Sequence, residues 1–252
     1  MQQMRTEAAE HRNELWVCHL GVTPYRQAVA IQERVRAARR ADALPDMLLL
    51  LEHPPVYTRG RRSSEGELTL GEDFYRERGI EVIATDRGGR ITYHAPGQLV
   101  GYPIMLIDAV DRYLRTMESA IIAALAAVGI HARARPADGP DYTGVWVEER
   151  KIASIGVHVS HGVTTHGFAV NVTNDLEPFA WVTACGLPGV SMTSVARELG
   201  ASGADGLQRL RTLMAEHYCR AHGRVPRTVA PARLGIDLPG VPFGATAEAI
   251  PA

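Results

Sequence analysis

The chain has 252 residues, of which 46% are hydrophobic and 22% charged, as expected for a globular protein with a buried core. Its formal net charge of −1 at pH 7 gives no electrostatic case for binding nucleic acid or an anionic membrane surface. Three widely spaced cysteines, Cys18, Cys185 and Cys219, argue against a disulfide framework and for a reducing compartment.

Targeting and membrane signals are also lacking in the sequence. The first sixteen residues contain no apolar core of signal-peptide length. The longest apolar run, residues 119–130, is rich in alanine and too short to cross a bilayer. We therefore expect a cytoplasmic protein that does not associate with membranes.

The first half of the chain alternates between strand and helix patterns. Residues 1–13 are polar and are expected to be frayed. Thr23 is the expected N-cap of the first helix, with Pro24 at the first helical position. The wholly apolar run 47–51 predicts a strand that is buried on both faces. In chain order, the patterns predict a strand at 15–20, a helix ending near 41, a strand at 47–51, a short helix at 73–78 and a strand at 80–84.

The second half continues with a long helix and then β-rich sequence. Three β-branched segments separated by short turns are typical of an antiparallel meander. Five prolines from residue 224 onward suggest a tail that is poorly ordered or lies on the surface. Mixed strands and helices without strict alternation predict an α+β domain with a mixed sheet. The expected elements are a strand end at 104–107, a helix at 108–129, strands at 144–148, 152–159 and 164–172, a short helix capped by Thr193 or Ser194, and a final helix around 207–218.

A glycine-rich stretch, residues 86–103 (DRGGRITYHAPGQLVGYP), is the most unusual local feature. Glycine lets a ligand approach the main chain closely, so this run is consistent with a loop shaped around a bound molecule. A turn between two strands is the competing interpretation.

Two side chains outside this stretch are candidates for chemistry. Cys185 lies in a loop shortly before a helix start, where backbone N–H groups can favour a thiolate. Cys18 and Cys219 fall within a predicted strand and a predicted helix, so we expect both to be packing residues. Lys151 opens a strand that is otherwise apolar, although a lysine next to a turn is most often solvated.

Histidines offer a metal site as an alternative. His158, His161 and His166 lie close together in sequence, but their spacing fits no closed zinc pattern and the cysteines lie elsewhere. We therefore predict no metal.

Four blocks in order make the sequence resemble a known family. They are residues 52–58 (EHPPVYT), 87–98 (RGGRITYHAPGQ), 151–157 (KIASIGV), and 166–169 (HGFA) with 185–187 (CGL). Together they resemble the lipoyl(octanoyl) transferases, the octanoyl-acyl-carrier-protein:protein octanoyltransferases. The resemblance covers residues 16–222, and one departure is Ala95, which stands where the family usually has glycine.

The resemblance implies a fold like that of the biotin and lipoate protein ligases, with a mixed sheet flanked by helices. It also implies an octanoyltransferase that needs no ATP, metal or other cofactor. Its donor would be octanoyl-acyl carrier protein. Its acceptors would be lipoyl domains of 2-oxoacid dehydrogenase complexes and the glycine cleavage H protein. We expect a monomer with a flexible N-terminus (1–13), a single acyltransferase domain (14–223) and a proline-rich tail (224–252).

Residue roles also follow from the resemblance. Cys185 stands where the family has its acyl-accepting nucleophile, and Lys151 where it has the partnering base. The implied substrate-binding residues are Arg87, Gly88, Gly89, Arg90, Ile91, Thr92, Tyr93, His94, Ser154, Ile155, Gly156, Gly167, Phe168 and Ala169.

Three other functions compete with the transferase. An ATP-dependent lipoate or biotin ligase of the same fold would need no nucleophilic thiol, and a carrier-protein binding module would do no chemistry. A thiol hydrolase would release free octanoate. For the transferase, Arg59, Arg61, Arg62 and Arg90 are candidates for contacting an acidic carrier protein, although arginine clusters are commonly just solvated.

Overall fold

The computed structural model describes residues 13–183, 190–200 and 204–235. Within them, seven strands form a mixed sheet in the order β10-β1-β2-β6-β9-β8-β7. The pairs β10–β1 and β1–β2 are parallel, and every other neighbouring pair is antiparallel. The strands are β1 (Glu14–Val22), β2 (Met47–Glu52), β6 (Gln98–Ile104), β7 (Gly144–Val147), β8 (Arg150–Ser160), β9 (Val163–Asn171) and β10 (Val225–Val229).

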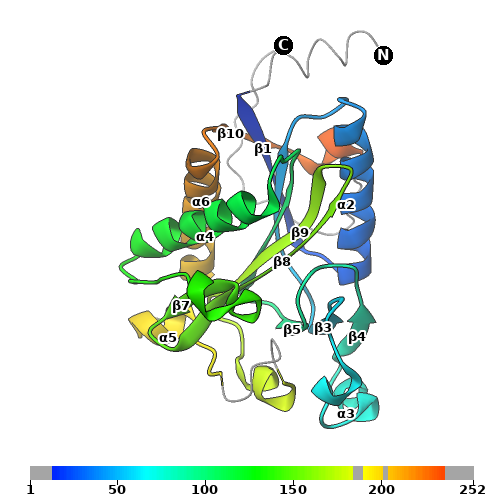
Figure 1. Cartoon of the computed structure of the whole chain (residues 1–252), viewed down its shortest axis with the longest axis vertical. Coiled ribbons are helices and arrows are strands. Elements are labelled where there is room, and N and C mark those ends of the chain that lie inside the picture. The colour runs from blue at the N-terminus through cyan, green and yellow to red at the C-terminus, as the bar shows by residue number, and fades with distance from the viewer. Residues whose placement is uncertain (1–12, 184–189, 201–203, 236–252) are drawn as a thin grey trace.

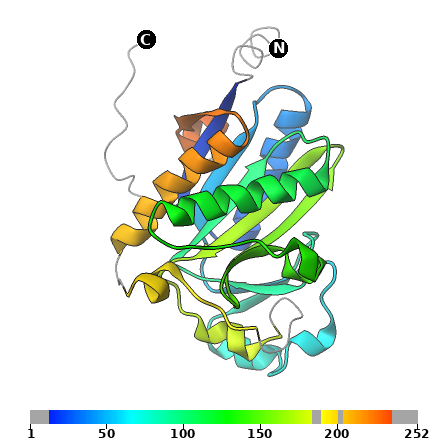
Figure 2. The ribbon, with the colours of Figure 1, turned by 60° about the vertical axis from the view of Figure 1, so that its left-hand side comes forward.

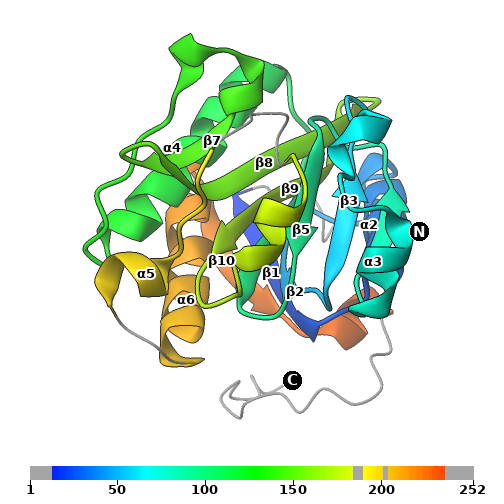
Figure 3. The same ribbon diagram turned by 90° about the horizontal axis from the view of Figure 1, so that it is seen from below.

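A second, three-stranded sheet has the order β4-β3-β5 and comprises β3 (Val56–Arg59), β4 (Glu81–Ala84) and β5 (Ile91–His94). It stands next to the large sheet, with the short helix α3 (Glu72–Glu77) on its outer side (Figure 3). The glycine-rich stretch therefore begins just after β4, contributes β5 to the small sheet, and passes into β6 at the centre of the large one.

Helices cover both faces of the large sheet. Figure 1 shows α4 and α6 on one side and α2 on the other, and Figure 2 shows α4 and α6 running across their face of the sheet. The helices are α2 (Tyr25–Arg40), α4 (Val110–Ala126), the short α5 (Val195–Leu199) and α6 (Ala204–Ala221). Single 3₁₀ turns lie at η1 (Glu65–Glu67), η2 (Pro136–Asp138), η3 (Pro140–Tyr142), η4 (Glu177–Trp181) and η6 (Pro231–Leu234).

Strand β2 shows why the sheet is buried on both faces. Leu48 and Leu50 pack into the core beneath α4 and α6, whereas Leu49 and Leu51 pack into the core beneath α2. Successive side chains of a strand point to opposite faces, so a strand with both faces covered needs an unbroken apolar run. The predicted doubly buried strand at 47–51 is therefore confirmed.

The mixed sheet flanked by helices confirms the predicted fold class, and the meander of β7, β8 and β9 is antiparallel as expected. Ser194 caps α5 by accepting a hydrogen bond from the Arg197 N–H. Pro24, rather than Thr23, occupies the N-cap position of α2, and the Thr23 hydroxyl instead donates to the Leu20 carbonyl.

The structure corrects two sequence-based expectations about strands and adds one strand that the sequence did not predict. Strand β6 ends at Ile104, so no strand continues through 104–107. Strand β3 was missed because it follows two prolines and is only four residues long. Residues 225–229, expected to belong to the tail, form β10 because they pair in parallel with β1.

Candidate active site

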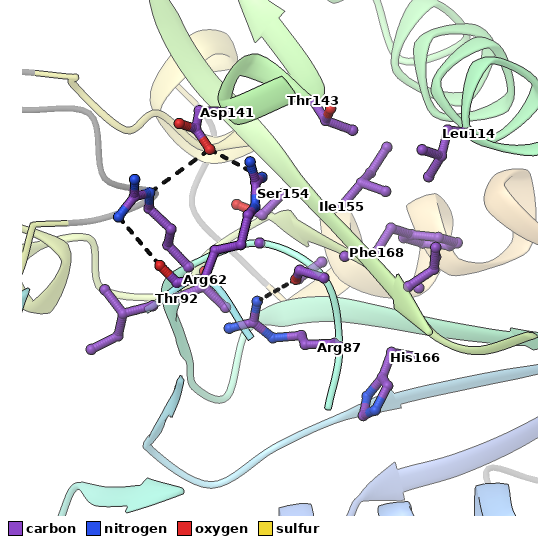
Figure 4. Close-up of a pocket in the computed structure, with 18 of the residues that line it drawn as sticks. Arg62, Arg87, Thr92, Leu114, Asp141, Thr143, Ser154, Ile155, His166 and Phe168 are labelled. Atoms are coloured by element: carbon purple, nitrogen blue, oxygen red, sulfur yellow. Dashed lines mark hydrogen bonds and ion pairs between the residues drawn. The ribbon is translucent and has the colours of Figure 1, made fainter. Parts of the chain in front are cut away.

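A cavity of about 290 Å³ opens between the glycine-rich stretch, strands β8 and β9, helix α4 and turn η3. Leu114, Thr143, Ile155 and Phe168 gather on the side nearer α4, whereas Arg62 and Thr92 lie on the opposite side (Figure 4). The cavity therefore has an apolar wall and a polar, arginine-bearing wall.

The glycine-rich stretch is hydrogen bonded to β8 and packs closely against it. The Gly88 N–H donates to the Val157 carbonyl at 2.8 Å. A Cβ on Gly156 would lie 2.7 Å from the Gly88 carbonyl oxygen, so only glycine permits this close approach of two backbones. The buried guanidinium of Arg87 donates to the Thr58 hydroxyl at 2.8 and 3.1 Å and to its own neighbour, the Gly88 carbonyl. These contacts shape one wall of the cavity.

Nearly all of the predicted substrate-binding residues line this cavity. The exception is Tyr93, whose ring packs against Tyr57 and Phe179 in a separate apolar cluster. Side chains alternate along β5, so Tyr93 faces away from its cavity-lining neighbours. The predicted residues that line the cavity are Arg87, Gly88, Gly89, Arg90, Ile91, Thr92, His94, Lys151, Ser154, Ile155, Gly156, Gly167, Phe168 and Ala169.

Lys151 is buried in the cavity wall, with 2% of its surface exposed. It is the single lysine of the chain, and the other 26 of its 27 basic residues are arginines. Its ammonium group lies 5.3 Å from the centre of the Trp146 ring, a cation–π distance. An arginine remains protonated throughout the physiological range, whereas a lysine side chain can in general give up its proton. Lys151 therefore differs in its chemistry from the other 26 basic side chains of the chain.

Cys185 falls in residues 184–189, outside the described part of the chain. The residues on either side of that segment are hydrogen bonded. The Thr183 N–H donates to the Glu67 carbonyl at 3.0 Å, and the Lys151 N–H donates to the Ser191 carbonyl at 2.9 Å. Ser191, two residues after that segment, thus lies directly beside Lys151.

A buried polar chain joins the glycine-rich stretch to the same region. The Gln98 amide donates to Asn171 Oδ1 at 2.9 Å, and the Asn171 amide donates to the Thr193 carbonyl at 3.0 Å. Since the Gln98 nitrogen is a donor, its Oε1 accepts from His94 Nδ1 at 2.7 Å. Burial holds the pKa of His94 well below its usual value, so this imidazole is neutral at pH 7.

A second histidine, His166, also lines the cavity. Its Nε2 lies 2.8 Å from Asp86 Oδ1, and this hydrogen bond lowers the pKa of Asp86 to about 2. His158 Nε2 lies 3.6 Å from the other oxygen of the same carboxylate. Within the described residues, no group of three or more His, Cys, Asp or Glu side chains is arranged to hold a metal ion.

Three comparisons with known proteins place the chain in a family. Residues 24–217 match the model of the lipoyl protein ligase A/B catalytic domain. The chain belongs to this family. Its similarity to an octanoyltransferase of Rubrobacter xylanophilus is 48% identity over 199 residues, covering 77% of this chain and 88% of the relative. An octanoyltransferase of Acidothermus cellulolyticus is 49% identical over 192 residues, covering 72% and 81%. The resemblance drawn from the four sequence blocks is therefore confirmed.

Solved structures of lipoate protein ligases share the fold. A lipoate-protein ligase A bound with ATP superposes with a TM-score of 0.68 at 19% identity, covering 86% of this chain and 89% of that one. A bipartite lipoate protein ligase from Thermoplasma acidophilum gives a TM-score of 0.67 at 18% identity, covering 86% and 87%. At this identity the match establishes the lipoyl ligase fold and nothing finer.

The binding residues expected from the sequence omit several residues that line the cavity. Val110, Leu114 and Asp141 lie far from the family blocks, and Arg62 was expected only as a contact of the carrier protein. Val110 and Leu114 belong to α4, and their spacing of four residues puts them on one helix face. Arg62 and Asp141 meet in an ion pair of 3.0 Å at the cavity (Figure 4). That Lys151 is the single lysine of the chain is a further signal that the sequence carries by itself. No helix in the described ranges has the length and apolar character needed to span a membrane.

Proposed function

We propose that this protein is an octanoyltransferase that acts in protein lipoylation. It moves an octanoyl group from the phosphopantetheine thiol of acyl carrier protein to a lysine amine of a lipoyl domain. Membership of the lipoyl ligase family and the octanoyltransferase relatives support this activity. The observation that carries the proposal is the single lysine of the chain, which is buried in a cavity wall and bonds through its N–H to Ser191, two residues after the segment that contains Cys185.

The cavity supports an acyl substrate. At about 290 Å³ it lies at the small end of ligand pockets, which span about 300–1,000 Å³. Leu114, Ile155 and Phe168 provide an apolar wall. Burying about seven carbons beyond the carbonyl would contribute roughly 5 kcal/mol at about 0.8 kcal/mol per methylene.

Cys185 is the proposed nucleophile, and the other two thiols are poorly suited to that role. Cys18 and Cys219 are both buried, and burial raises the pKa of each thiol to about 12. Such thiols are almost entirely protonated at neutral pH, whereas the thiolate is the nucleophilic form.

The proposed reaction has two steps. The Cys185 thiolate attacks the carbonyl of the donor thioester, a new thioester forms on the enzyme, and the phosphopantetheine thiol leaves. The amine of the acceptor lysine then attacks this enzyme thioester, an amide forms, and the Cys185 thiolate is released. In the first step the Lys151 ammonium gives its proton to the departing phosphopantetheine thiolate. In the second step the neutral Lys151 amine takes the proton that the acceptor amine loses, which restores the starting state. Dividing the transfer into two easier steps is the advantage of covalent catalysis.

Intact-mass analysis after incubation with octanoyl-acyl carrier protein tests this proposal. We expect the wild type to gain one octanoyl group, and Cys185→Ser to lose the thioester adduct. Cys219→Ala is the matched control and should keep the adduct. A wild type that never gains the octanoyl group would contradict the covalent mechanism.

The same assay separates the rival activities. A ligase would need octanoate and ATP in place of the carrier thioester, and a hydrolase would release octanoate without an amine acceptor. A binding module would bind the carrier with no turnover, and Lys151→Ala would leave its behaviour unchanged.

The remaining features of the proposal concern cofactors, partners and location. The enzyme acts without ATP, metal or another cofactor, as a monomer in the cytoplasm. Its acceptors are the lipoyl domains of 2-oxoacid dehydrogenase complexes and the glycine cleavage H protein. Transfer that persists in the presence of a chelator, and a single monomeric species in sedimentation, are the expected observations.

A further inference from the structure

Helix α4 places a buried carboxylate behind Lys151. Val110, Leu114 and Glu118 follow one another at intervals of four residues, so they share one face of the helix. The first two line the cavity, and Glu118 is the next residue along that face. Only 1% of the Glu118 surface is exposed. A buried carboxylate is costly unless it is paired and hydrogen bonded, so its partners indicate what it does.

Glu118 and Lys151 meet at Gly144, the first residue of β7. Glu118 Oε1 accepts the Gly144 N–H at 3.1 Å. A Cβ on Gly144 would lie 2.7 Å from Lys151 Cε and 3.4 Å from its Nζ. Gly144 has a φ of +141°, in a region that favours glycine. Glu118 Oε1 thus holds the Gly144 backbone in place, and the end of the Lys151 side chain packs against that backbone.

The second oxygen of Glu118 is shared with an arginine. Arg115 Nη1 lies 2.6 Å from Glu118 Oε2, and the Arg115 side chain is 39% exposed. Burial raises the pKa of Glu118, while the Gly144 N–H and the charges of Arg115 and Lys151 act in the opposite direction. Two cations, one buried and one half-buried, therefore interact with a single carboxylate.

We propose that Glu118 is a positioning residue that holds Lys151 in the cavity wall and sets the pH at which its amine loses its proton. The positive charge of Arg115, which is paired with the same carboxylate, weakens this effect of Glu118. Only the consequence for catalysis rests on the proposed function. The Glu118 carboxylate favours the ammonium form of Lys151, and the Arg115 guanidinium reduces that influence.

The other titratable groups around the cavity stay unchanged in the variants of Glu118 and Arg115. The 190–193 segment contacts Lys151 through its backbone, and β7 contributes the uncharged Trp146. Two buried tyrosines, Tyr25 and Tyr102, also line the cavity. Its remaining titratable residues are Arg62, Arg87, Arg90, His94, Asp141 and His166.

The single lysine makes a direct experiment possible. In protein labelled with ¹³Cε-lysine, one side-chain resonance reports the protonation of Lys151, because no other lysine exists in the chain. We expect Glu118→Gln, which keeps an oxygen acceptor for Gly144, to move the titration midpoint to lower pH by about one unit. Arg115→Gln should move it to higher pH. The acid limb of the pH–rate profile for octanoyl transfer should move in the same directions.

Asp46→Asn is the matched control. Asp46 is also a buried carboxylate that accepts a backbone N–H, from Leu106, and pairs with arginine, Arg39. It does not line the cavity, so its variant should lose stability without moving the Lys151 titration. Titrations of Glu118→Gln and Arg115→Gln that coincide with the wild type would overturn the proposal. If the shifts are observed but no octanoyl transfer is detected in the wild type, the proposed function fails while the Glu118–Lys151 coupling stands.

Discussion

The Phe168 ring lies directly over Gly101 on the neighbouring strand: a Cβ on Gly101 would lie 2.1 Å from the ring's Cζ atom. Phe168 is also part of the cavity wall. The absence of a side chain at Gly101 therefore determines where the ring can lie, and with it the shape of the apolar wall.

Gly101→Ala should disturb the acyl pocket. The added methyl group forces the Phe168 ring to move, and overpacking of this kind costs about 1–3 kcal/mol. We expect kcat/KM for the octanoyl donor to fall about tenfold or more, with shorter donors affected less. Donors of graded chain length provide the measurement. Gly66→Ala is the control, because a Cβ there meets nothing within 4 Å. An unchanged chain-length preference would count against Phe168 as a wall of the acyl pocket.

Lys151→Arg should abolish most of the transfer. Arginine keeps the positive charge but cannot act as a base near neutral pH, and loss of a general base commonly costs about 10²–10⁴ in rate. Steady-state transfer to a lipoyl domain measures the loss. The double variant Arg150→Lys/Lys151→Arg carries the same two residue types in exchanged positions. It should stay inactive, because Arg150 is half-exposed and paired with Glu148 and Glu198. Recovery of activity in the double variant would show that a lysine at position 150 can replace Lys151, and would contradict the need for a buried lysine at position 151.

Exposed arginines near the cavity predict a salt-sensitive encounter with an acidic carrier protein. The arginines predicted to contact the carrier differ in their ion pairs. Arg62 and Arg90 pair with Asp141, and Arg90 also pairs with Glu67. The side chain of Arg61 is exposed. Arg61→Glu should raise KM for octanoyl-acyl carrier protein several-fold and leave kcat nearly unchanged. Wild-type KM should rise with salt. Arg209→Glu, an exposed site on α6, is the control, and equal effects of both variants would exclude a local docking role.

Buried neutral histidines predict a loss of stability in mild acid. Burial lowers the pKa of His53 and of His222 to about 4, from an ordinary value near 6.5. As the pH falls from about 6.5 to about 4, the unfolded chain binds protons that the folded chain does not, so the free energy of unfolding decreases. The loss is about 2 kcal/mol per histidine by about pH 5. Urea denaturation at several pH values measures it.

The half-buried His222 allows a check of this prediction. His222→Gln should remove its share of the pH dependence and leave that of His53, whose ring lies between the Thr23 carbonyl and the Tyr102 hydroxyl. A free energy of unfolding that stays constant from pH 7 to pH 5 would contradict the assignment of neutral buried histidines.

The sequence alone determined the elements whose signals are local. The apolar run at 47–51, the antiparallel meander and the Ser194 cap depend on neighbouring residues, and period and capping chemistry can be read directly from them. The family blocks likewise named most of the residues that line the cavity. The pairing of residues 225–229 with β1 joins opposite ends of the chain, so no local pattern could predict it.

Only the tertiary structure decided the surroundings of Lys151. In sequence it follows a turn, where lysine is usually solvated, yet 2% of its surface is exposed. Lys151 is buried because α4, β7 and residues 190–193 pack around it. Helix α4 and residues 190–193 are distant from Lys151 in sequence, and β7 is separated from it by a turn. Glu118 carried no sequence signal for the same reason: a carboxylate on a helix becomes a partner of a buried lysine only when folding brings Gly144 between them.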